Sequence, residues 1–162
     1  MHIRERAGMM PKRNYNENLS FHFMSEDDVI PVYELEKECF SVPWSIKSIS
    51  EELQNANARF ILVEINGETA GYVGSYFVSG EVYITNVAVK NKYRRKGVAV
   101  GLLSKLIDLA KEAKSEFVSL EVRCLNTQAI SLYGKLGFEK LGVRKNFYEN
   151  PREDALIMTK YL

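Results

Sequence analysis

The sequence lacks the features that mark several large classes of protein. Its 162 residues include only two cysteines, Cys39 and Cys124, with no CxxC spacing, so neither a disulfide framework nor a zinc site is indicated. No run of about 18 apolar residues exists, which argues against a transmembrane helix. Basic residues number 22 and acidic residues 21, so no global field exists to hold a nucleic acid or an anionic membrane. Any recognition must be local.

Residues 1–18 lack the apolar stretch that a cleaved secretory signal requires. They show no usable periodicity and contain Gly8 and Pro11, so we expect a flexible tail. Residues 19–162 are enough for one domain with one core, and 46% apolar with 27% charged residues is ordinary for a globular protein. With so few cysteines, a cytoplasmic protein is expected. We further expect a monomer or weak dimer.

Alternating strand and helix patterns fill the rest of the chain. Strands are expected at 19–24, 59–65, 69–78, 81–89, 117–123, 138–147 and 155–162. Helices are expected at about 29–39, 45–54, 98–114 and 126–136. Tight-turn residues separate the second, third and fourth strands, which predicts an antiparallel meander, and a strand, helix and strand crossover then makes the middle pair parallel. The fold class is an α/β sandwich with a mixed, mostly antiparallel sheet of about seven strands and four helices.

Local signals mark the helix ends. Ser45 and Asn126 are placed to cap the second and fourth helices, and Gly137 to end the fourth in the left-handed conformation. Residues 25–28 supply capping oxygens for the first helix, whose apolar side should be Val29, Val32, Leu35 and Cys39.

The segment after Val89 is the first with chemical content. Five of the seven residues from 90 to 96 are basic, and Gly97 with small residues follows at the start of a helix. A helix N-terminus presents unpaired N–H groups and a partial positive charge, and small residues let phosphates approach the backbone. This predicts a pyrophosphate cradle, although it is neither a GxxxxGK[ST] loop nor a GxGxxG fingerprint. The alternative is a solvated basic turn before an ordinary helix.

Within this segment Arg94, Gly97 and Ala99 match the pattern Q/R-x-x-G-x-G/A, which resembles the acetyl-coenzyme A loop of the GCN5-related N-acetyltransferase (GNAT) family. Residues 120–126 and 129–138 are similar to the signature LEVR-x-x-N...A-I-x-L-Y-x-x-x-G-F. That signature is found in the RimI-type ribosomal-protein alanine N-acetyltransferases and the related archaeal protein N-terminal acetyltransferases. Two further stretches, 42–45 and 144–158, resemble the FPWS and RRNYY...REDAIIM elements of the same subfamily.

The resemblance implies a GNAT-type sandwich that moves acetyl from acetyl-CoA, as co-substrate and without a metal, to the N-terminal amine of a ribosomal protein or nascent chain. Cofactor contacts are expected from Val87, Ala88, Val89, Arg94, Arg95, Lys96, Gly97, Val98, Ala99, Val100 and Asn126. For Val87 and Val89 only backbone groups are expected to take part. Trp44 and Tyr148 are expected to wall the peptide cleft, although buried packing explains both.

The resemblance also assigns the two catalytic roles. Glu121 lies on the strand face opposite Val118, Leu120 and Val122 and would be the base, acting through water. At pH 7 an α-amine needs only about 1.4 kcal/mol to become neutral, against roughly 4.6 for a lysine, so a modest base suffices. Tyr133 would protonate the departing thiolate, which is uphill by roughly 2 kcal/mol unless the site lowers its pKa, or else transfer is late.

Other interpretations stay open at this point. The fold could acetylate a small-molecule amine or a lysine side chain, or it could be a non-catalytic acyl-CoA-binding module. A nucleic-acid role is disfavoured because the basic run is short and has no aromatic platform beyond Tyr93. Cys124 has no histidine nearby and is interpreted as a small hydrophobe, and neither His2 nor His22 is given a role.

Overall fold

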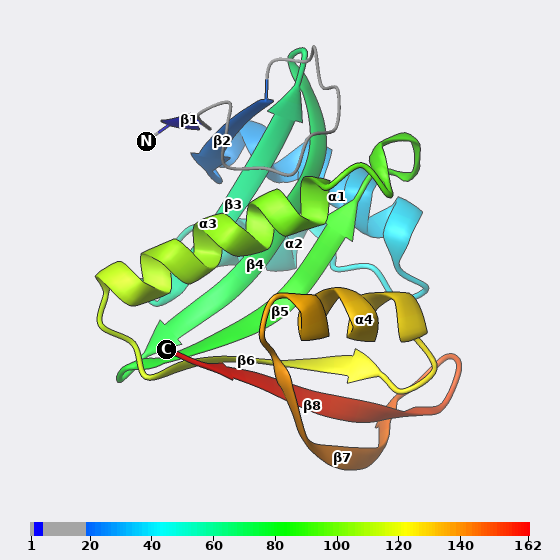
Figure 1. Ribbon diagram of the computed structural model, residues 1–162. Helices are drawn as coiled ribbons and strands as arrows, with labels where there is room; N and C mark the ends of the chain where they lie inside the picture. Colours follow the sequence, from blue (N-terminus) through cyan, green and yellow to red (C-terminus); the bar gives the residue numbers. More distant parts are fainter. Residues whose placement is uncertain (1, 5–18) are drawn as a thin grey trace.

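The computed structural model describes residues 2–4 and 19–162 (Figure 1). Its strands are β1 (His2–Arg4), β2 (Leu19–Phe23), β3 (Ala58–Ile65), β4 (Glu68–Val78), β5 (Glu81–Val89), β6 (Phe117–Arg123), β7 (Glu139–Tyr148) and β8 (Glu153–Tyr161). Its α-helices are α1 (Val29–Cys39), α2 (Ile46–Glu52), α3 (Val98–Glu112) and α4 (Thr127–Lys135). No helix in this described part of the chain is long and apolar enough to cross a membrane.

One sheet with the strand order β1-β2-β3-β4-β5-β6-β8-β7 runs through the described residues. Every neighbouring pair is antiparallel except β5 and β6, which are parallel. Helices α1 and α2 lie on one face of the sheet, and α3 and α4 lie on the other (Figure 1). The predicted mixed α/β sandwich, its meander from β3 to β5 and its central parallel pair are therefore confirmed.

Strand β1 is an addition to the seven predicted strands. It pairs antiparallel with β2, where the backbone register sets His2 opposite His22. It falls within the segment expected to be a flexible tail. The remainder of that segment, Met1 and residues 5–18, lies outside the described residues.

The C-terminal strands do not follow chain order in the sheet. Strand β8 pairs with β6 along its length, from Phe117 opposite Tyr161 to Arg123 opposite Ala155, and β7 is the outer strand. Helix α4 therefore connects β6 to a strand two places away. As a result β6, which carries Glu121, is held between β5 and β8.

The predicted end signals of the helices are confirmed. Ser45 Oγ accepts the N–H of Ser48 at 3.1 Å, and Asn126 Oδ1 accepts the N–H of Ala129 at 3.2 Å. Gly137 follows α4 with φ of 93°, the left-handed conformation that glycine adopts without strain. Short-range chemistry alone fixes these ends, which is why the sequence predicts them well.

An apolar core lies on each face of the sheet. On the α3 side the largest contribution comes from Leu102, Leu103 and Leu106, which are fully buried. On the α1 side Val32 and Ile49 are equally buried. At roughly 2 kcal/mol for each buried aliphatic side chain, these contacts hold both helix layers against the sheet.

Candidate active site

A gap between β5 and β6 determines where the site lies. The two strands pair over only three positions, ending with Tyr83 opposite Ser119. From Ile84 to Val89, β5 is paired with β4 alone, and Figure 1 shows β5 and β6 running apart from there. Backbone groups on the parted edge of β5 have no ladder partner there and can bind a ligand. The predicted cofactor residues Val87, Ala88 and Val89 lie on this segment.

A β-bulge in β5 decides which way its side chains point. Gly74 of β4 pairs with Asn86 and the next residue, Ser75, pairs with Ile84, so Thr85 is the extra residue. The bulge interrupts the simple alternation along the strand. Side chains before and after it, those of Val82, Ile84, Val87 and Val89, pack on the α3 side, and those of Asn86 and Ala88 face α1.

The predicted phosphate cradle lies at the N-terminus of α3. Gly97 stands there with φ of 82°, and no side chain caps the first turn of the helix. The side chain of Val98 is buried in the core, so only its backbone faces the loop. The N–H groups of Val98, Ala99 and Val100 are the ones that a diphosphate would meet.

The basic residues before this helix differ in their partners. Lys90 and Lys92 form ion pairs with Glu68 of β4, at 3.4 and 2.6 Å. The hydrogen bonds from Lys92 and Tyr93 lower the pKa of Glu68 to about 2. These two lysines are therefore tied to the sheet, and the exposed Arg95 and Lys96 stand beside the helix start.

Arg94 connects the loop to β5 and α1. Its Nε donates to the carbonyl of Val89 at 3.0 Å, and its Nη2 lies 3.4 Å from Cys39 Sγ. Cys39 donates to the same carbonyl at 3.5 Å. Burial raises the pKa of the Cys39 thiol, with Arg94 opposing. Of the two backbone groups of Val89, the carbonyl is thus already bonded within the protein.

Glu121 lies on β6 with its side chain about 30% exposed. Its Oε1 is 3.2 Å from Arg144 Nε on β7. The strand alternation is as predicted, because Val118, Leu120 and Val122 are buried on the other face. Arg144 engages one carboxylate oxygen, which leaves Oε2 as the oxygen that can take a proton.

Tyr133 is buried on α4, 8% exposed, with its ring edge-on to Phe138 at 5.8 Å between centroids. Burial, with a smaller effect from Tyr148, raises its pKa to about 12. The phenol therefore keeps its proton at neutral pH. Of the two routes that the sequence left for proton donation, the raised pKa favours late transfer over donation by a phenol of lowered pKa.

Tyr148 links the two candidate catalytic groups. Burial, then the negative charge of Glu121, raises its pKa to about 12, and Tyr148 in turn acts on Tyr133. Its ring is covered by the guanidinium of Arg123 at 4.3 Å. Tyr148 therefore lies close enough to Glu121 and to Tyr133 to interact electrostatically with each of them.

The two predicted cleft walls come from segments that touch. Ser41, in the loop between α1 and α2, donates through Oγ to the carbonyl of Asn150 at 2.7 Å. Asn150 belongs to the turn after Tyr148. Trp44, in the same loop as Ser41, is half-buried and packs on Phe60 with ring centroids 6.0 Å apart. The loop between α1 and α2 thus meets the turn after β7.

Sequence reasoning missed Glu36, a fully buried carboxyl on α1. Its Oε1 accepts the hydroxyl of Tyr72 at 2.7 Å and the Nδ2 of Asn86 at 2.8 Å. Burial raises its pKa to about 7. A signal was present, because Glu36 follows Val32 by four residues and precedes Cys39 by three, on the apolar side of the helix.

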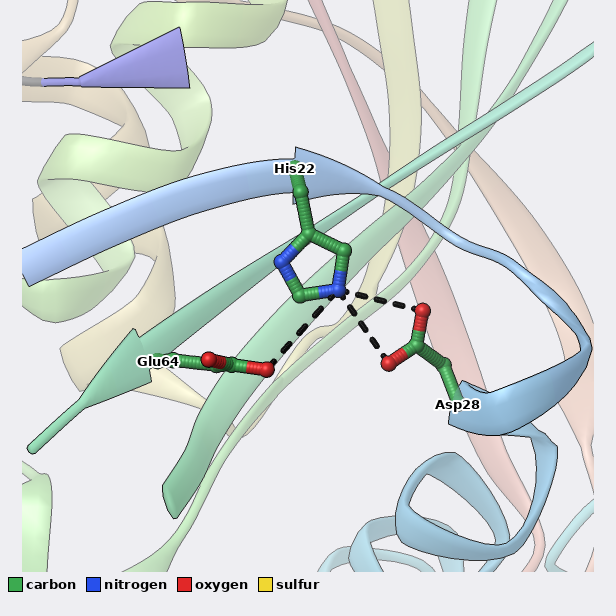
Figure 2. A group of neighbouring side chains, drawn as sticks. All are labelled: His22, Asp28 and Glu64. Carbon is green, nitrogen blue, oxygen red and sulfur yellow. Dashed lines mark hydrogen bonds and ion pairs between the residues drawn. The ribbon is translucent and has the colours of Figure 1, made fainter. Parts of the chain in front are cut away.

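A second buried polar cluster lies at the start of α1 (Figure 2). His22 Nε2 is 3.1 Å from both carboxylate oxygens of Asp28 and 4.0 Å from Glu64 Oε1. These residue types can hold a metal ion, and their ligand atoms lie within 4.8 Å of one another. Asp28, however, also accepts the N–H and hydroxyl of Ser25, at 2.8 and 3.1 Å. Protein donors therefore already occupy its carboxylate, and the cluster joins α1 to β2.

Known proteins share this fold and much of this sequence. The family model for the GNAT acetyltransferases matches residues 29–138. A Bacillus subtilis relative is 40% identical over 136 residues, which are 83% of this chain and 90% of that protein.

Two solved structures are similar to this chain in fold, and one of them contains the co-substrate. The ribosomal-protein-S18-alanine N-acetyltransferase from Escherichia coli superposes with a TM-score of 0.83 and 31% identity, over 88% of this chain and 93% of that one. A GNAT family acetyltransferase from Elizabethkingia anophelis, solved with acetyl-CoA bound, superposes with a TM-score of 0.74 and 26% identity. The match covers 89% of this chain and 98% of that one. The chain belongs to the GNAT family, and it is an acetyltransferase that uses acetyl-CoA.

Proposed function

We propose that this protein acetylates the N-terminal α-amine of a polypeptide by direct transfer from acetyl-CoA, with ribosomal protein bS18 as the model substrate. The observation that carries the proposal is the gap between β5 and β6, with the partly exposed Glu121 on β6 beside it and Tyr148 interacting with both Glu121 and Tyr133. The E. coli protein named for this reaction on S18 supports the substrate class. Residues 19–162 act as a single N-acetyltransferase domain, in the cytoplasm.

Acetyl-CoA lies across the gap with its diphosphate on the first turn of α3. The cradle consists of the loop residues Arg94, Arg95, Lys96 and Gly97, and the backbone of Val98, Ala99 and Val100. Val87 and Val89 bind the acetyl and pantetheine groups through backbone groups on the open edge of β5, with Ala88 between them. Asn126 supports this end of the site while it caps α4.

Glu121 takes the proton of the attacking amine through a water molecule. Its partly exposed carboxylate supports this role, because a water can reach Oε2 while Arg144 orients Oε1. The amine then attacks the thioester carbon, and the C–S bond breaks to release the thiolate of coenzyme A. A chain N-terminus suits this site, since an α-amine loses its proton far more readily than a lysine.

Tyr133 gives its proton to the departing thiolate late in the reaction. With the phenol near 12 and a thiol near 8.5, the transfer is uphill by roughly 5 kcal/mol. A turnover of about 10 per second corresponds to a barrier of roughly 16 kcal/mol, so this step fits within the reaction. Because the phenol is protonated at neutral pH, its proton is present when the thiolate departs.

Trp44 and Tyr148 form the walls of the peptide cleft. The hydrogen bond from Ser41 to Asn150 supports this, since it holds the loop that carries Trp44 against the turn that follows Tyr148. The substrate chain enters between them with its amine toward Glu121. The cradle then holds the diphosphate of acetyl-CoA, and the cleft holds the peptide that receives the acetyl group.

The test is mass spectrometry of peptides incubated with labelled acetyl-CoA. A peptide with the bS18 N-terminus should gain one acetyl group, and the same peptide with a blocked N-terminus should gain none. Acetylation of the blocked peptide on lysine, or of small amines alone, would overturn the proposal. Binding of acetyl-CoA without any transfer would overturn it as well.

The catalytic roles are tested by Glu121→Gln and Tyr133→Phe. Each should lower kcat by about 100-fold and leave acetyl-CoA binding within about twofold, because both act on protons in the transition state. Glu139→Gln and Tyr161→Phe, at exposed positions on β7 and β8, are the matched controls and should keep full turnover. Unchanged kcat in either catalytic variant removes that residue from its role.

A further inference from the structure

The contact between α1 and β5 leaves two buried acceptor oxygens without a partner. Glu36 Oε2 and Asn86 Oδ1 are both buried and accept no hydrogen bond. They belong to the same two side-chain ends that are joined by the bond from Asn86 Nδ2 to Glu36 Oε1, at 2.8 Å. Two buried acceptors without a donor are costly in a protein interior, and a single hydrogen shared between them would satisfy both.

A proton on Glu36 supplies that hydrogen. A neutral carboxylic acid carries one donor and one acceptor side by side, and so does a primary amide. Placed end to end, the two groups form a closed ring with two parallel hydrogen bonds. The bond from Asn86 to Oε1 is one half of this ring. The other half forms when Oε2–H donates to Asn86 Oδ1.

We infer that Glu36 is a positioning residue for acetyl transfer: as the neutral acid it closes a ring with Asn86 and so fixes the backbone of β5 at Val87, where the acetyl group is held. This rests on the proposed binding of acetyl-CoA along β5. Glu36 touches neither the cofactor nor the reacting atoms, since its side chain has no solvent exposure. It acts through Asn86.

Asn86 lies where a contact from α1 can fix the position of the β5 backbone. Asn86 follows the bulge at Thr85 and directly precedes Val87, in the part of β5 that has lost its pairing with β6. Because this part of β5 has one open edge, its position depends on its pairing with β4 and on side-chain contacts from the helices that cover the sheet. The ring with Glu36 provides a hold from the α1 face. Burial favours the neutral acid there and raises its pKa to about 7.

Titratable and polar side chains from α1, β4 and β5 lie around Glu36. From β4 comes Tyr72, which donates to Oε1. Tyr76 of β4 packs against the same apolar cluster as Tyr72, and its hydroxyl bonds Glu52 of α2 at 2.7 Å. Its own helix adds Cys39, and beyond Cys39 lies Arg94. From β5 the facing group is the amide of Asn86, which does not titrate. Glu36 is thus the group whose protonation near neutral pH changes this contact.

The deciding experiment compares acetyl-CoA binding by wild-type protein and Glu36→Gln between pH 6 and pH 8.5, by titration calorimetry without peptide. Glutamine presents the same donor and acceptor as the neutral acid and cannot lose them. The wild-type Kd should therefore rise about fivefold relative to the variant as pH increases, the effect of one lost hydrogen bond. Titration of the nucleotide itself is common to both proteins and cancels in the ratio.

Two further variants separate positioning from simple structural support. Tyr72→Phe removes a donor to the carboxylate and should move the midpoint of the pH effect upward without removing it. Glu34→Gln changes an exposed glutamate on the same helix and should follow the wild-type curve. A constant ratio of wild-type to Glu36→Gln affinity across pH overturns the inference, even if the variant is less stable.

This outcome is independent of the substrate proposal. Binding is measured without an acceptor, so a protein that acetylates no peptide can still show the pH-dependent ratio, which would support the role of Glu36 and refute only the substrate. Peptide acetylation with a constant ratio would support the substrate and refute the role of Glu36.

Discussion

Two buried carboxyl groups connect α1 to the sheet, and they are completed in different ways. Asp28, at the start of the helix, receives hydrogen bonds from His22, from the backbone of Ser25 and from its hydroxyl. Glu36, near the end of the helix, receives two bonds on one oxygen and none on the other. A carboxylate surrounded by donors is stable with its charge, whereas one that lacks them favours the neutral acid.

The difference follows their positions in the fold. The Asp28 cluster joins α1 to β2, far along the sheet from the gap between β5 and β6. Glu36 contacts β5 itself, beside the gap. One helix thus uses the same chemical group for two purposes: Asp28 is a saturated anchor at its N-cap, and Glu36 makes a protonation-dependent contact near the proposed cofactor strand.

The largest effect is expected for Asp28→Ala. It removes three hydrogen bonds and leaves His22 and the backbone of Ser25 without this acceptor, so the free energy of unfolding should fall by about 4 kcal/mol. Urea denaturation measures this loss. Acetyl-CoA binding by the folded fraction should stay within about twofold, and a tenfold loss would mean that the anchor and the site are not separate.

A somewhat smaller effect, with a pH signature, is expected for Glu36→Gln. The pKa of Glu36 in the folded protein, about 7, exceeds its ordinary value of 4.5, so folding binds this proton more tightly. The wild-type protein therefore loses stability as the pH rises from 4.5 through 7. At pH 8.5 the variant should be more stable than the wild type by about 3 kcal/mol, relative to their difference at pH 4.

Denaturation curves at several pH values measure this difference. Asp28→Asn is the matched control, because it replaces a carboxylate whose two oxygens both have hydrogen-bond partners. It should be destabilised at neutral pH and should not gain stability as the pH rises. If both variants respond to pH in the same way, the two carboxyls do not differ as described.

The smallest effect is expected for Ser25→Ala. It removes only the hydroxyl bond to Asp28 and leaves the bond from the Ser25 backbone in place. Loss of one capping hydrogen bond should cost about 1 kcal/mol, independent of pH between 6 and 8.5. Thermal unfolding detects it, and a loss as large as that of Asp28→Ala would show that the hydroxyl dominates the cluster.

Much of the fold could be predicted because its signals are local. The tight turns at Asn66 and Ser79 have positive φ at both central residues, and the caps of α2 and α4 use the residues expected from the sequence. Hydrophobic spacing likewise identified four helices and seven of the strands. These features depend on neighbours within a few residues, whose chemistry can be read along the chain.

The sheet order near the C-terminus and the face of Asn86 could not be predicted in this way. Insertion of β8 between β6 and β7 depends on pairing across long separations. The bulge at Thr85 shifts the alternation by one residue, and only its pairing with β4 reveals it. Without that shift Asn86 cannot be assigned to the side of α1.

The sequence by itself determined the sandwich, the basic turn before α3, and the identity of the candidate residues such as Glu121 and Tyr133. Tertiary structure alone decided that Tyr133 is buried, with its pKa raised, and that Glu36 meets Asn86 across 50 residues of chain. The physical reason is that helices, turns and caps are set by local geometry, whereas burial and the pairing of polar groups are set by segments distant in the chain.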